Sequence, residues 1–597
     1  MGELSQRDDP LSQALDHVGS GRLMEAEALL RKILAVQPNH QEALHALGLI
    51  AFQVGSHDAA LELIGRASQA APNNAIYANN LGTVQQKLGK KAAAEANFRR
   101  ALAMDVNYPD ALYNLGNVLA EMEQLDAAID LYQRTLRNNP NHAAAHYNLG
   151  NTLQDLGRIA DAIASFDIAI QLNPAFVAAH SNRLLSMQYL DTAPADHVRG
   201  AAQQFADALE TPRKAAWPMH RSVRDPNKRL KVGYVSADFR RHSVGYYIEP
   251  LLANHDASQV ETYCYYSHPQ DDEMTRRMIQ VANHWRPCHA LTDDALAACI
   301  LDDGIDILVD LGGHTAHSRL AVFAQKPAPI QVAYLGYPAT TGLTAMDYRL
   351  TDVIADPIEM DASRYSETLL RLSRTFLCYR PPTEAPAVVP LPAIESGQVA
   401  FGSFNALPKL SPATIALWSR ILRALPGSTL TLKSSGLAHA SVRGRLIDDF
   451  ARHGVEPSRL ILLVRDADFM THLARYAALD ICLDPLGYNG TTTTCEALWM
   501  GVPTISLRGY QHAARVGASL LASVGLNTLV CETENAYVDT ALALANDLPR
   551  LAAMRNTMRA RLEASPLLDG KDLAAAIESA CRDIWMRWCN AQAGARA

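Results

Sequence analysis

The cysteines of this chain lack the spacing of metal or disulfide motifs. Nine cysteines are scattered over 597 residues, and none forms a Cys-x-x-Cys pair. Zinc sites and disulfide frameworks are typically built from closely spaced cysteines. We therefore expect buried thiols in a protein of a reducing compartment, and no structural metal.

Long apolar runs and an excess of basic residues are also missing. The first residues, MGELSQRDDPLSQALD, contain neither a basic segment nor an apolar core, and no apolar run has the length of a membrane span. The formal net charge of −8 argues against general binding to nucleic acid or to a membrane surface. These absences predict a soluble, cytoplasmic protein with no nucleic-acid or membrane partner.

Two common nucleotide-binding fingerprints are absent as well. The chain has no Gly-x-x-x-x-Gly-Lys-Ser/Thr loop and no Gly-x-Gly-x-x-Gly beside a strand, so the usual signs of a kinase or a dehydrogenase are missing. An Asp-x-Asp pair occurs at Asp466 and Asp468. Because this pair opens a predicted helix, we interpret it as an N-cap and not as a metal site.

The N-terminal third repeats itself every 34 residues. A proline, a glycine and an alanine register share this period, and Val106 stands at the one position of the proline register that lacks proline. The three registers are Pro38, Pro72, Pro140 and Pro174; Gly48, Gly82, Gly116 and Gly150; and Ala26, Ala60, Ala94, Ala128 and Ala162. Small residues let two helices cross closely and proline ends a helix, so the period predicts stacked helix pairs.

This period resembles the tetratricopeptide repeat, most clearly in the unit YNLGNVLAEMEQLDAAIDLYQRTLRNNPNH. We predict five repeats over about residues 7–176, followed by a sixth, partial unit that begins at Phe176 or Val177. Most repeats carry a glycine in the turn between their two helices, namely Gly55, Gly89 and Gly157. Glu123 replaces this glycine in one repeat, so we expect a less regular turn there.

An asparagine column runs through successive repeats. It consists of Asn80, Asn114, Asn148 and Asn182. The helices that carry these residues are predicted to line the concave face of a superhelix, where the amides could grip an extended peptide backbone. The alternative is that they bridge adjacent repeats. We favour binding of a protein acceptor, because the polar column is uninterrupted.

After the repeats, short β-branched runs alternate with helical segments. This alternation predicts parallel sheets that are covered by helices on both faces. The series starts at residue 229, is interrupted by a loop rich in proline at 379–398, and then starts again. The predicted fold is thus α + α/β, with a tetratricopeptide-repeat superhelix followed by two Rossmann-like lobes. The predicted domains are repeats over 7–190, a linker helix and loop over 191–228, a first lobe over 229–385, and a second lobe with a terminal helix over 386–597.

The stretch YNGTTTTCEALWMG places four threonines at the start of a predicted helix, directly after a strand. Two Rossmann-like lobes bind ligands in the cleft outside the carboxyl ends of their strands. A helix N-terminus attracts anions, and Thr491 to Thr494 would add hydroxyl donors for a diphosphate. The alternative is that the threonines only cap the helix.

Other polar residues favour the anion site, because they are predicted to face the same cleft. They are Lys409, His472, Arg475 and Glu496. Glu496 could accept hydrogen bonds from a ribose, as acidic residues do in dinucleotide folds.

The chain resembles the protein O-GlcNAc transferase family, in which tetratricopeptide repeats precede a two-lobed GT-B glycosyltransferase region. The motifs that carry the resemblance are GYVSADFRRHSVGY, PAPIQVAYLGYPATTG, FGSFNALPKLSP and GTTTTCEALWMGVP. They occur in the order of the family, and the resemblance covers almost the whole chain. The SPINDLY-like branch is the most similar one, since its helix also begins with Thr-Thr-Thr-Thr-Cys-Glu.

The resemblance implies roles for the residues that match family motifs. Lys409 would contact the donor diphosphate and stabilise the leaving group, and His242 would reach the cleft from the first lobe. The implied donor-binding residues are His472, Arg475, Thr491, Thr492, Thr493, Glu496, Leu335, Gly336, Tyr337 and Pro338. His242 is a candidate general base, with orientation of the sugar or a phosphate as the alternative. His314 and Thr315 are further candidates beside the cleft, with a structural role in their loop as the alternative.

Two departures from the family motifs leave the donor open. Thr491 replaces a histidine of the O-GlcNAc-transferring members, and Ala406 replaces a glutamine. The resemblance favours UDP-GlcNAc, with GDP-fucose or the nucleotide sugar of a flagellin glycosyltransferase as alternatives. The implied reaction is an inverting displacement by a Ser or Thr hydroxyl of a protein that the repeats hold, with no metal ion or other cofactor.

A different class of function is a repeat scaffold whose transferase region is inactive and binds partners. The intact motif around Lys409 and the complete threonine turn argue against it. The oligomeric state stays open, and a homodimer is compatible with the sequence.

Overall fold

The computed structural model of the protein describes residues 9–191, 194–220 and 222–591. The chain forms two compact units, which divide between Leu153 and Gln154. This division lies inside the predicted repeat region and not at its end near residue 190.

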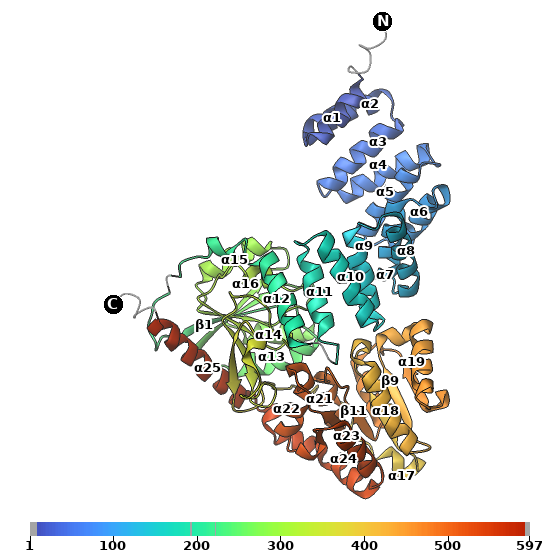
Figure 1. The fold of residues 1–597 in the computed structure, drawn as a ribbon. Helices are drawn as coiled ribbons and strands as arrows, with labels where there is room; N and C mark the ends of the chain where they lie inside the picture. The colour runs from blue at the N-terminus through green and yellow to red at the C-terminus, as the bar shows by residue number, and fades with distance from the viewer. Residues whose placement is uncertain (1–8, 192–193, 221, 592–597) are drawn as a thin grey trace. The chain divides into compact units, whose positions relative to one another are not determined.

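The first unit consists of antiparallel helix pairs (Figure 1, blue). Its helices are α1 (Pro10–Gly19), α2 (Leu23–Val36), α3 (Gln41–Gln53), α4 (His57–Ala70), α5 (Ala75–Lys87), α6 (Lys91–Met104), α7 (Pro109–Glu121), α8 (Leu125–Asn138) and α9 (Ala143–Asp155). The glycine register lies where the two helices of a pair meet. A Cβ atom on Gly116 would come within 2.7 Å of Tyr132 Cε1, and one on Gly82 would come within 2.7 Å of Phe98 Cε1. The prediction that small residues permit this close crossing is confirmed.

The turn at Glu123 keeps the geometry of the other repeats. Glu123 has a φ of 60°, in the same left-handed region as Gly55 and Gly89. A residue with a Cβ atom is strained by roughly 1–2 kcal/mol in that conformation. The expectation of a less regular turn is therefore wrong for the backbone, because the helix packing on both sides imposes the conformation.

The second unit begins with α10 (Ile159–Leu172), α11 (Val177–Met187) and α12 (Ala195–Leu209). Helices α11 and α12 share a hydrophobic core with the first lobe, to which Leu184 and Phe205 contribute fully buried side chains. A Cβ atom on Gly342 would lie 2.5 Å from the Ala202 carbonyl oxygen, so the first lobe approaches α12 closely. The sixth repeat is thus packed against the first lobe.

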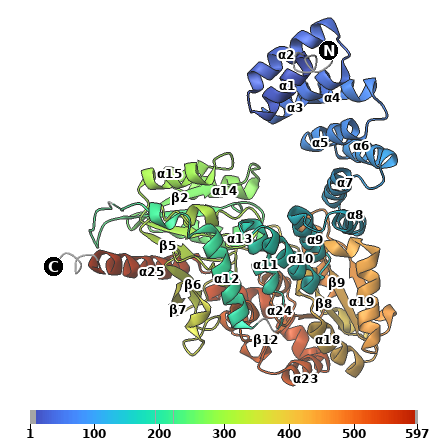
Figure 2. The same cartoon turned by 45° about the horizontal axis from the view of Figure 1, so that its top comes forward.

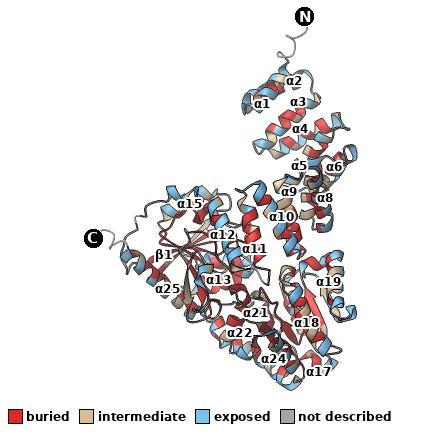
Figure 3. Cartoon of the chain, in the orientation of Figure 1, coloured by how far each residue is buried: buried red, intermediate tan, exposed pale blue. Residues whose placement is uncertain are grey.

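The first lobe contains, within the described residues, a seven-stranded parallel sheet of order β3-β2-β1-β4-β5-β6-β7. The strands are β1 (Leu230–Ser236), β2 (Val260–Tyr266), β3 (His284–Pro287), β4 (Ile307–Asp310), β5 (Ile330–Ala333), β6 (Tyr348–Asp352) and β7 (Thr368–Leu372). The helices are α13 (Ser243–Asn254), α14 (Glu273–Val281), α15 (Asp293–Asp303) and α16 (Leu320–Phe323). The strands are mostly buried, as Figure 3 shows, because helices cover the sheet.

The second lobe repeats this plan with a six-stranded parallel sheet, counted over the described part of the chain, of order β10-β9-β8-β11-β12-β13. The strands are β8 (Ala400–Ser403), β9 (Thr429–Lys433), β10 (Leu460–Leu463), β11 (Ile481–Leu483), β12 (Thr504–Leu507) and β13 (Val530–Cys531). The helices are α17 (Pro392–Ser396), α18 (Pro412–Ala424), α19 (Ala440–Arg452), α20 (Phe469–Ala474), α21 (Thr492–Trp499), α22 (Val516–Ser523), α23 (Glu534–Ala545) and α24 (Leu548–Glu563). The two predicted Rossmann-like lobes are confirmed.

The terminal helix α25 (Gly570–Ala591) returns to the first lobe (Figure 2). Glu578 accepts a hydrogen bond from the amide of Asp256, and Arg582 donates to the carbonyl oxygens of Pro226 and Lys228. The chain therefore connects the two lobes twice, once through the segment that precedes the second lobe and once through α25, which follows it.

The thiols and the helices agree with the absences noted in the sequence. All nine cysteines lie in the described part of the chain, where each is free and all but the partly exposed Cys299 are buried. None of the helices within the described ranges has both the length and the apolar character needed to cross a membrane.

Candidate functional site

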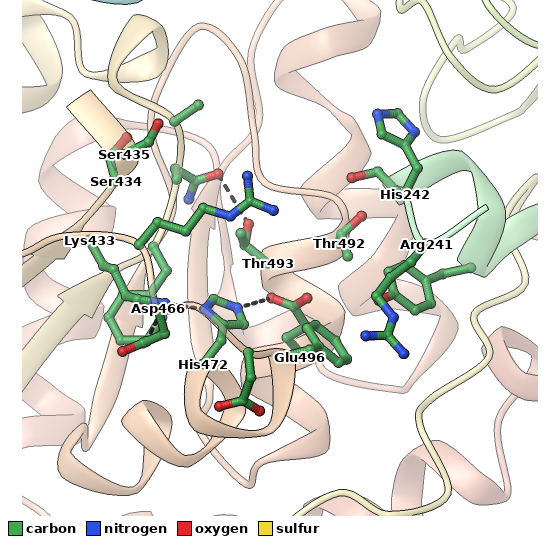
Figure 4. Close-up of a pocket in the computed structure, with 18 of the residues that line it drawn as sticks. Arg241, His242, Lys433, Ser434, Ser435, Asp466, His472, Thr492, Thr493 and Glu496 are labelled. Atoms are coloured by element: carbon green, nitrogen blue, oxygen red, sulfur yellow. Dashed lines mark hydrogen bonds and ion pairs between the residues drawn. The ribbon is translucent and has the colours of Figure 1, made fainter. Parts of the chain in front are cut away.

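A cavity of about 490 Å³ lies between the two lobes, at the carboxyl ends of their strands (Figure 4). The first lobe contributes Arg241 and His242, which follow β1. The second lobe contributes Asn405 after β8, Lys433 at the end of β9, and residues around α20 and α21. Parallel strands carry these residues to one edge, so the cavity occupies the position predicted from the fold.

The four threonines at the start of α21 have different surroundings. Thr491 is the N-cap residue of α21, and Thr492 and Thr493 line the cavity. Thr494 is buried and its hydroxyl donates to the Gly490 carbonyl oxygen at 3.1 Å. A Cβ atom on Gly490 would lie 2.5 Å from Thr493 Oγ1, so glycine is needed for the turn. One threonine therefore stabilises the helix start, while two face the cavity.

Glu496 and His472 form a bonded pair on the floor of the cavity. His472 Nε2 lies 2.9 Å from Glu496 Oε2 (Figure 4). The Tyr476 hydroxyl donates to the same carboxylate oxygen at 3.2 Å. Glu496 is buried, so its second oxygen is held in a fixed direction. A fixed carboxylate beside a helix N-terminus is suited to a ribose whose phosphates lie on that N-terminus.

A second group of charges surrounds His472 from the side of β9 and β10. Lys433 forms an ion pair with Asp466 at 2.8 Å and a short contact with His472 Nδ1. Arg475 forms an ion pair with Asp466 at 3.0 Å. Burial alone would raise the pKa of Asp466, but hydrogen bonds from Arg475 and Lys433 hold it below its usual value. Asp466 is thus an ionised anchor for two cations, and Asp468 is the N-cap of α20, as predicted.

Lys409 contacts the loop that leads into Thr491–Thr494. Its Nζ donates to the Asn489 carbonyl oxygen at 2.8 Å and lies 4.0 Å from the ring centre of Tyr488. Burial lowers the pKa of Lys409 to about 8, and Asp484 opposes this shift. The ammonium group is therefore close to the loop that starts α21 but is not among the groups that line the cavity.

His242 lies at the first-lobe wall of the cavity and caps α13. Its Nδ1 accepts a hydrogen bond from the Val244 amide at 3.3 Å, and the same atom lies 3.4 Å from Asp238 Oδ2. Burial lowers the pKa of His242, although Asp238 opposes the shift. A neutral imidazole that accepts at Nδ1 carries its proton on Nε2. In that form His242 offers a donor to a ligand, and its role as a general base stays a prediction.

The turn after β5 is more buried than the sequence indicated. The Tyr337 hydroxyl donates to the Leu184 carbonyl oxygen at 3.2 Å, and Tyr337 is 3% exposed. Leu335 has a φ of 76°, and a Cβ atom on Gly336 would lie 2.1 Å from the Leu311 carbonyl oxygen. Pro338 lines a separate small cavity with Gln511 and His512. None of these four residues lines the main cavity, because the turn packs against α11.

His314 and Thr315 are also placed apart from the main cavity. His314 is 0% exposed, its Nδ1 lies 2.8 Å from Ser181 Oγ, and its Nε2 lies 3.0 Å from the Thr341 carbonyl oxygen. The Thr315 hydroxyl donates to the Gly312 carbonyl oxygen. This geometry corresponds to the structural alternative, because the sixth repeat covers the loop.

The asparagine column makes contacts between repeats. Asn114 Nδ2 donates to Asn79 Oδ1 at 3.1 Å, and Asn148 Nδ2 donates to Asn117 Oδ1 at 2.8 Å. Asn80 Nδ2 lies 2.8 Å from the Nε2 atom of His45. Asn182 is half-buried on α11. The amides thus bridge adjacent repeats in the described geometry, and a role in binding a peptide stays a prediction.

Several cavity residues escaped the sequence reasoning. The most prominent are Arg241, Asn405, Lys433, Arg465, Tyr246 and Phe469. Among the described residues, the guanidinium groups of Arg241 and Arg465 have no hydrogen bond or ion pair, so two cations face the cavity unpaired. Tyr246 and Phe469 stack across the lobes with ring centres 5.6 Å apart. Lys433 could have been found as the polar residue that ends an apolar strand.

The comparisons with known proteins fit this geometry. The profile of glycosyl transferase family 41 matches residues 194–379 and 391–577, and that of the tetratricopeptide repeat matches 11–75, 79–143 and 113–175. The chain belongs to glycosyl transferase family 41. The cavity of this family 41 protein is enclosed by the two matched segments, which correspond to the two lobes.

Named relatives extend the likeness along the chain. A probable UDP-N-acetylglucosamine–peptide N-acetylglucosaminyltransferase SPINDLY of Oryza sativa subsp. japonica is 40% identical over 69% of this chain and 45% of its own length. The SPINDLY relative of Arabidopsis thaliana is 38% identical over 69% of this chain and 45% of its length. The chain thus spans about half the length of these curated relatives.

A solved structure covers more of the molecule. An O-GlcNAc transferase mutant of Thermobaculum terrenum superimposes with a TM-score of 0.80 at 36% identity, over 87% of this family 41 protein and 98% of that chain. The arrangement of repeats followed by two lobes is therefore shared with that enzyme.

Proposed function

We propose that this family 41 protein transfers a sugar from a nucleotide-sugar donor to Ser or Thr hydroxyl groups of protein substrates. One observation carries the proposal: the N-terminus of α21, with Thr492 and Thr493, opens into the same cavity as the His472–Glu496 pair. The first offers N–H and hydroxyl donors to a diphosphate, and the second offers a carboxylate to a ribose. The names of the relatives, which are probable peptide N-acetylglucosaminyltransferases, support the same activity.

UDP-GlcNAc is the donor that we propose first, because the names of the relatives specify it. The site itself recognises a nucleoside diphosphate through its phosphates and ribose, and these groups are common to UDP and GDP donors. GDP-fucose is kept as a second donor because the two motif positions at Thr491 and Ala406 differ from the O-GlcNAc-transferring pattern.

The proposed reaction is a single displacement. The acceptor oxygen bonds to the anomeric carbon as the bond from that carbon to the phosphate oxygen breaks, and the hydroxyl proton leaves to a base. Negative charge grows on the departing diphosphate, where the α21 N-terminus and Lys409 would stabilise it. His242 would donate from Nε2 to the sugar or a phosphate, since its Nδ1 already accepts the Val244 amide.

The repeats would supply the protein acceptor. Tetratricopeptide repeats support protein binding in general, and the asparagine column lies along successive helices of this region. Asn114 and Asn148 would have to exchange their bonds between repeats for bonds to a peptide, or bind it through their remaining oxygen atoms.

Calorimetric titration of the purified protein with UDP, GDP and CMP tests the site, followed by product release from UDP-GlcNAc and GDP-fucose. Selective binding of UDP and release of UDP from UDP-GlcNAc is the expected result. Selective use of GDP-fucose would show that GDP-fucose, and not UDP-GlcNAc, is the donor. Absence of binding to all three nucleotides would refute the proposed transferase activity and would favour a repeat scaffold that binds partners.

A further inference from the structure

The chain segment that follows α11 contacts the loop of residues 485–490, which leads into Thr491–Thr494. The ring of Tyr189 stacks on that of Tyr488, with ring centres 5.3 Å apart and an angle of 20° between the rings. Two residues further along, Asp191 Oδ1 accepts a hydrogen bond from the Gly487 amide at 3.1 Å. A Cβ atom on Gly487 would lie 2.9 Å from Asp191 Cα, so the two backbones touch. The sixth repeat therefore holds the loop of residues 485–490 from one side.

The second lobe holds the same loop from its other side. The side-chain amide of Gln511 donates to the Gly487 carbonyl oxygen at 2.9 Å, and the backbone amide of Asn489 donates to the Ala513 carbonyl oxygen at 2.9 Å. Asn489 is 0% exposed and its side chain bonds to Pro485 and Gly517. The loop has thus little freedom while both sets of contacts persist.

Lys409 is seated on this loop. Its Nζ atom lies 4.0 Å from the ring centre of Tyr488 and donates to the Asn489 carbonyl oxygen. An ammonium group over an aromatic ring is attracted by the negative face of the ring, and the attraction depends on the direction of that face. The direction of the Tyr488 ring is in turn fixed by its stack with Tyr189.

We propose that Tyr189 is a positioning residue for Lys409, acting through the ring of Tyr488. The inference rests on the proposed function, in which Lys409 stabilises the departing diphosphate. The sixth repeat then contributes more than a surface for acceptors, because its last aromatic side chain orients the cation of the donor site. Removal of the Tyr189 ring would leave Tyr488 free to rotate and would let water reach the ammonium group.

The test compares Tyr189→Leu with Tyr189→Phe in the full chain, by release of UDP from UDP-GlcNAc at several pH values. The leucine variant is expected to lower kcat about tenfold, with a change in donor KM of no more than about twofold. Hydration of the ammonium group should also move the alkaline fall of activity to higher pH. The phenylalanine variant keeps the ring and should retain most of the activity and the original pH profile.

Asp191→Ala and Asp191→Asn provide a second pair if the leucine variant does not fold. Asparagine still accepts from the Gly487 amide, whereas alanine does not, so the alanine variant alone should lower kcat and move the pH profile. Tyr510→Leu is the matched control, because Tyr510 is 91% exposed. It is expected to behave as the unchanged protein.

Lys409→Met, assayed in parallel, separates the two levels of the argument. If this variant turns over the donor normally, both the role of Lys409 and the role of Tyr189 are refuted. If it is inactive while folded Tyr189→Leu and Asp191→Ala proteins keep normal turnover and an unmoved pH profile, the positioning role of Tyr189 alone is refuted. An equal loss in Tyr189→Leu and Tyr189→Phe would refute it as well.

Discussion

Replacement of Lys409 by methionine should remove most of the turnover without weakening the fold. Methionine is similar in length to lysine and can fill the space along the Tyr488 ring. Removal of one preorganised group that stabilises developing charge typically lowers kcat by about 10²- to 10³-fold. We expect a loss of this size in UDP release from UDP-GlcNAc, with a smaller effect on the binding of UDP.

The effect on stability follows from the burial of the ammonium group. Burial lowers the pKa of Lys409 from 10.5 to about 8. Since one pKa unit corresponds to about 1.4 kcal/mol, the charged form is penalised by about 3 kcal/mol relative to a lysine in water. The hydrogen bond to Asn489 and the contact with Tyr488 are lost in the variant, so the net change should be a melting temperature that is equal or a few degrees higher.

The dependence of folding stability on pH gives the direction of the effect of the buried Lys409 ammonium group. The folded-state pKa of Lys409 is lower than its unfolded value, so the folded protein binds fewer protons and loses stability as pH falls from about 10.5 to about 8. The advantage of Lys409→Met over the unchanged protein should therefore be largest below pH 8 and should shrink as pH rises from 8 toward 10.5. Activity of the unchanged protein should fall in the same range, because the ammonium group loses its proton.

Differential scanning fluorimetry at pH 7 and at pH 9.5, together with steady-state UDP release, makes both measurements on one preparation. A methionine variant that keeps more than about a tenth of kcat would refute the charge-stabilising role. A variant that melts well below the unchanged protein at pH 7 would refute the argument that the buried charge is penalised.

Three further sets of substitutions test other parts of the protein. Gly490→Ala would place a Cβ atom 2.5 Å from Thr493 Oγ1, so UDP affinity in calorimetry should fall at least about tenfold, and unchanged affinity would contradict the proposed phosphate site. Gly116→Ala would place a Cβ atom 2.7 Å from Tyr132 and should lower the free energy of unfolding of the repeats in urea by about 1–3 kcal/mol. The control Gly65→Ala has nothing within 4 Å of the new Cβ atom and should be neutral or slightly stabilising. Equal effects of the two substitutions on the free energy of unfolding would argue against close helix crossing. The double variant Asn114→Ala, Asn148→Ala should weaken glycosylation of protein acceptors while UDP release without acceptor is spared, and equal loss of both activities would disprove that division of labour.

The local features of the fold could be predicted because they depend on periodicity. Gly82 and Gly116 recur every 34 residues and lie at the helix crossings, as the repeat required. The pattern of short strands and helices predicted two sheets, and both are present. The position of Thr492 and Glu496 in the cavity also followed, because parallel strands deliver their carboxyl ends to one edge.

Other features depend on which distant segments pack together, and a periodic pattern does not specify that. His314 is covered by Ser181, 133 residues away, and so it is a buried structural residue. Asn114 could have faced a groove or a neighbouring repeat, and only the tertiary geometry gives its bond to Asn79. Arg241 was not predicted as a cavity residue, because a charged side chain after a strand has no preferred partner in the sequence.

The amino-acid sequence by itself therefore determined the repeats, the two lobes and the helix that faces the cavity, since short-range spacing fixes which side of an element is apolar. Tertiary structure alone decided the surroundings of the functional groups. It seated Lys409 on the Tyr488 ring and placed Tyr189 of the sixth repeat against that ring. The stack of Tyr189 on Tyr488 joins residues about 300 positions apart, and the energies of both contacts depend on distances of a few ångströms that no local pattern encodes.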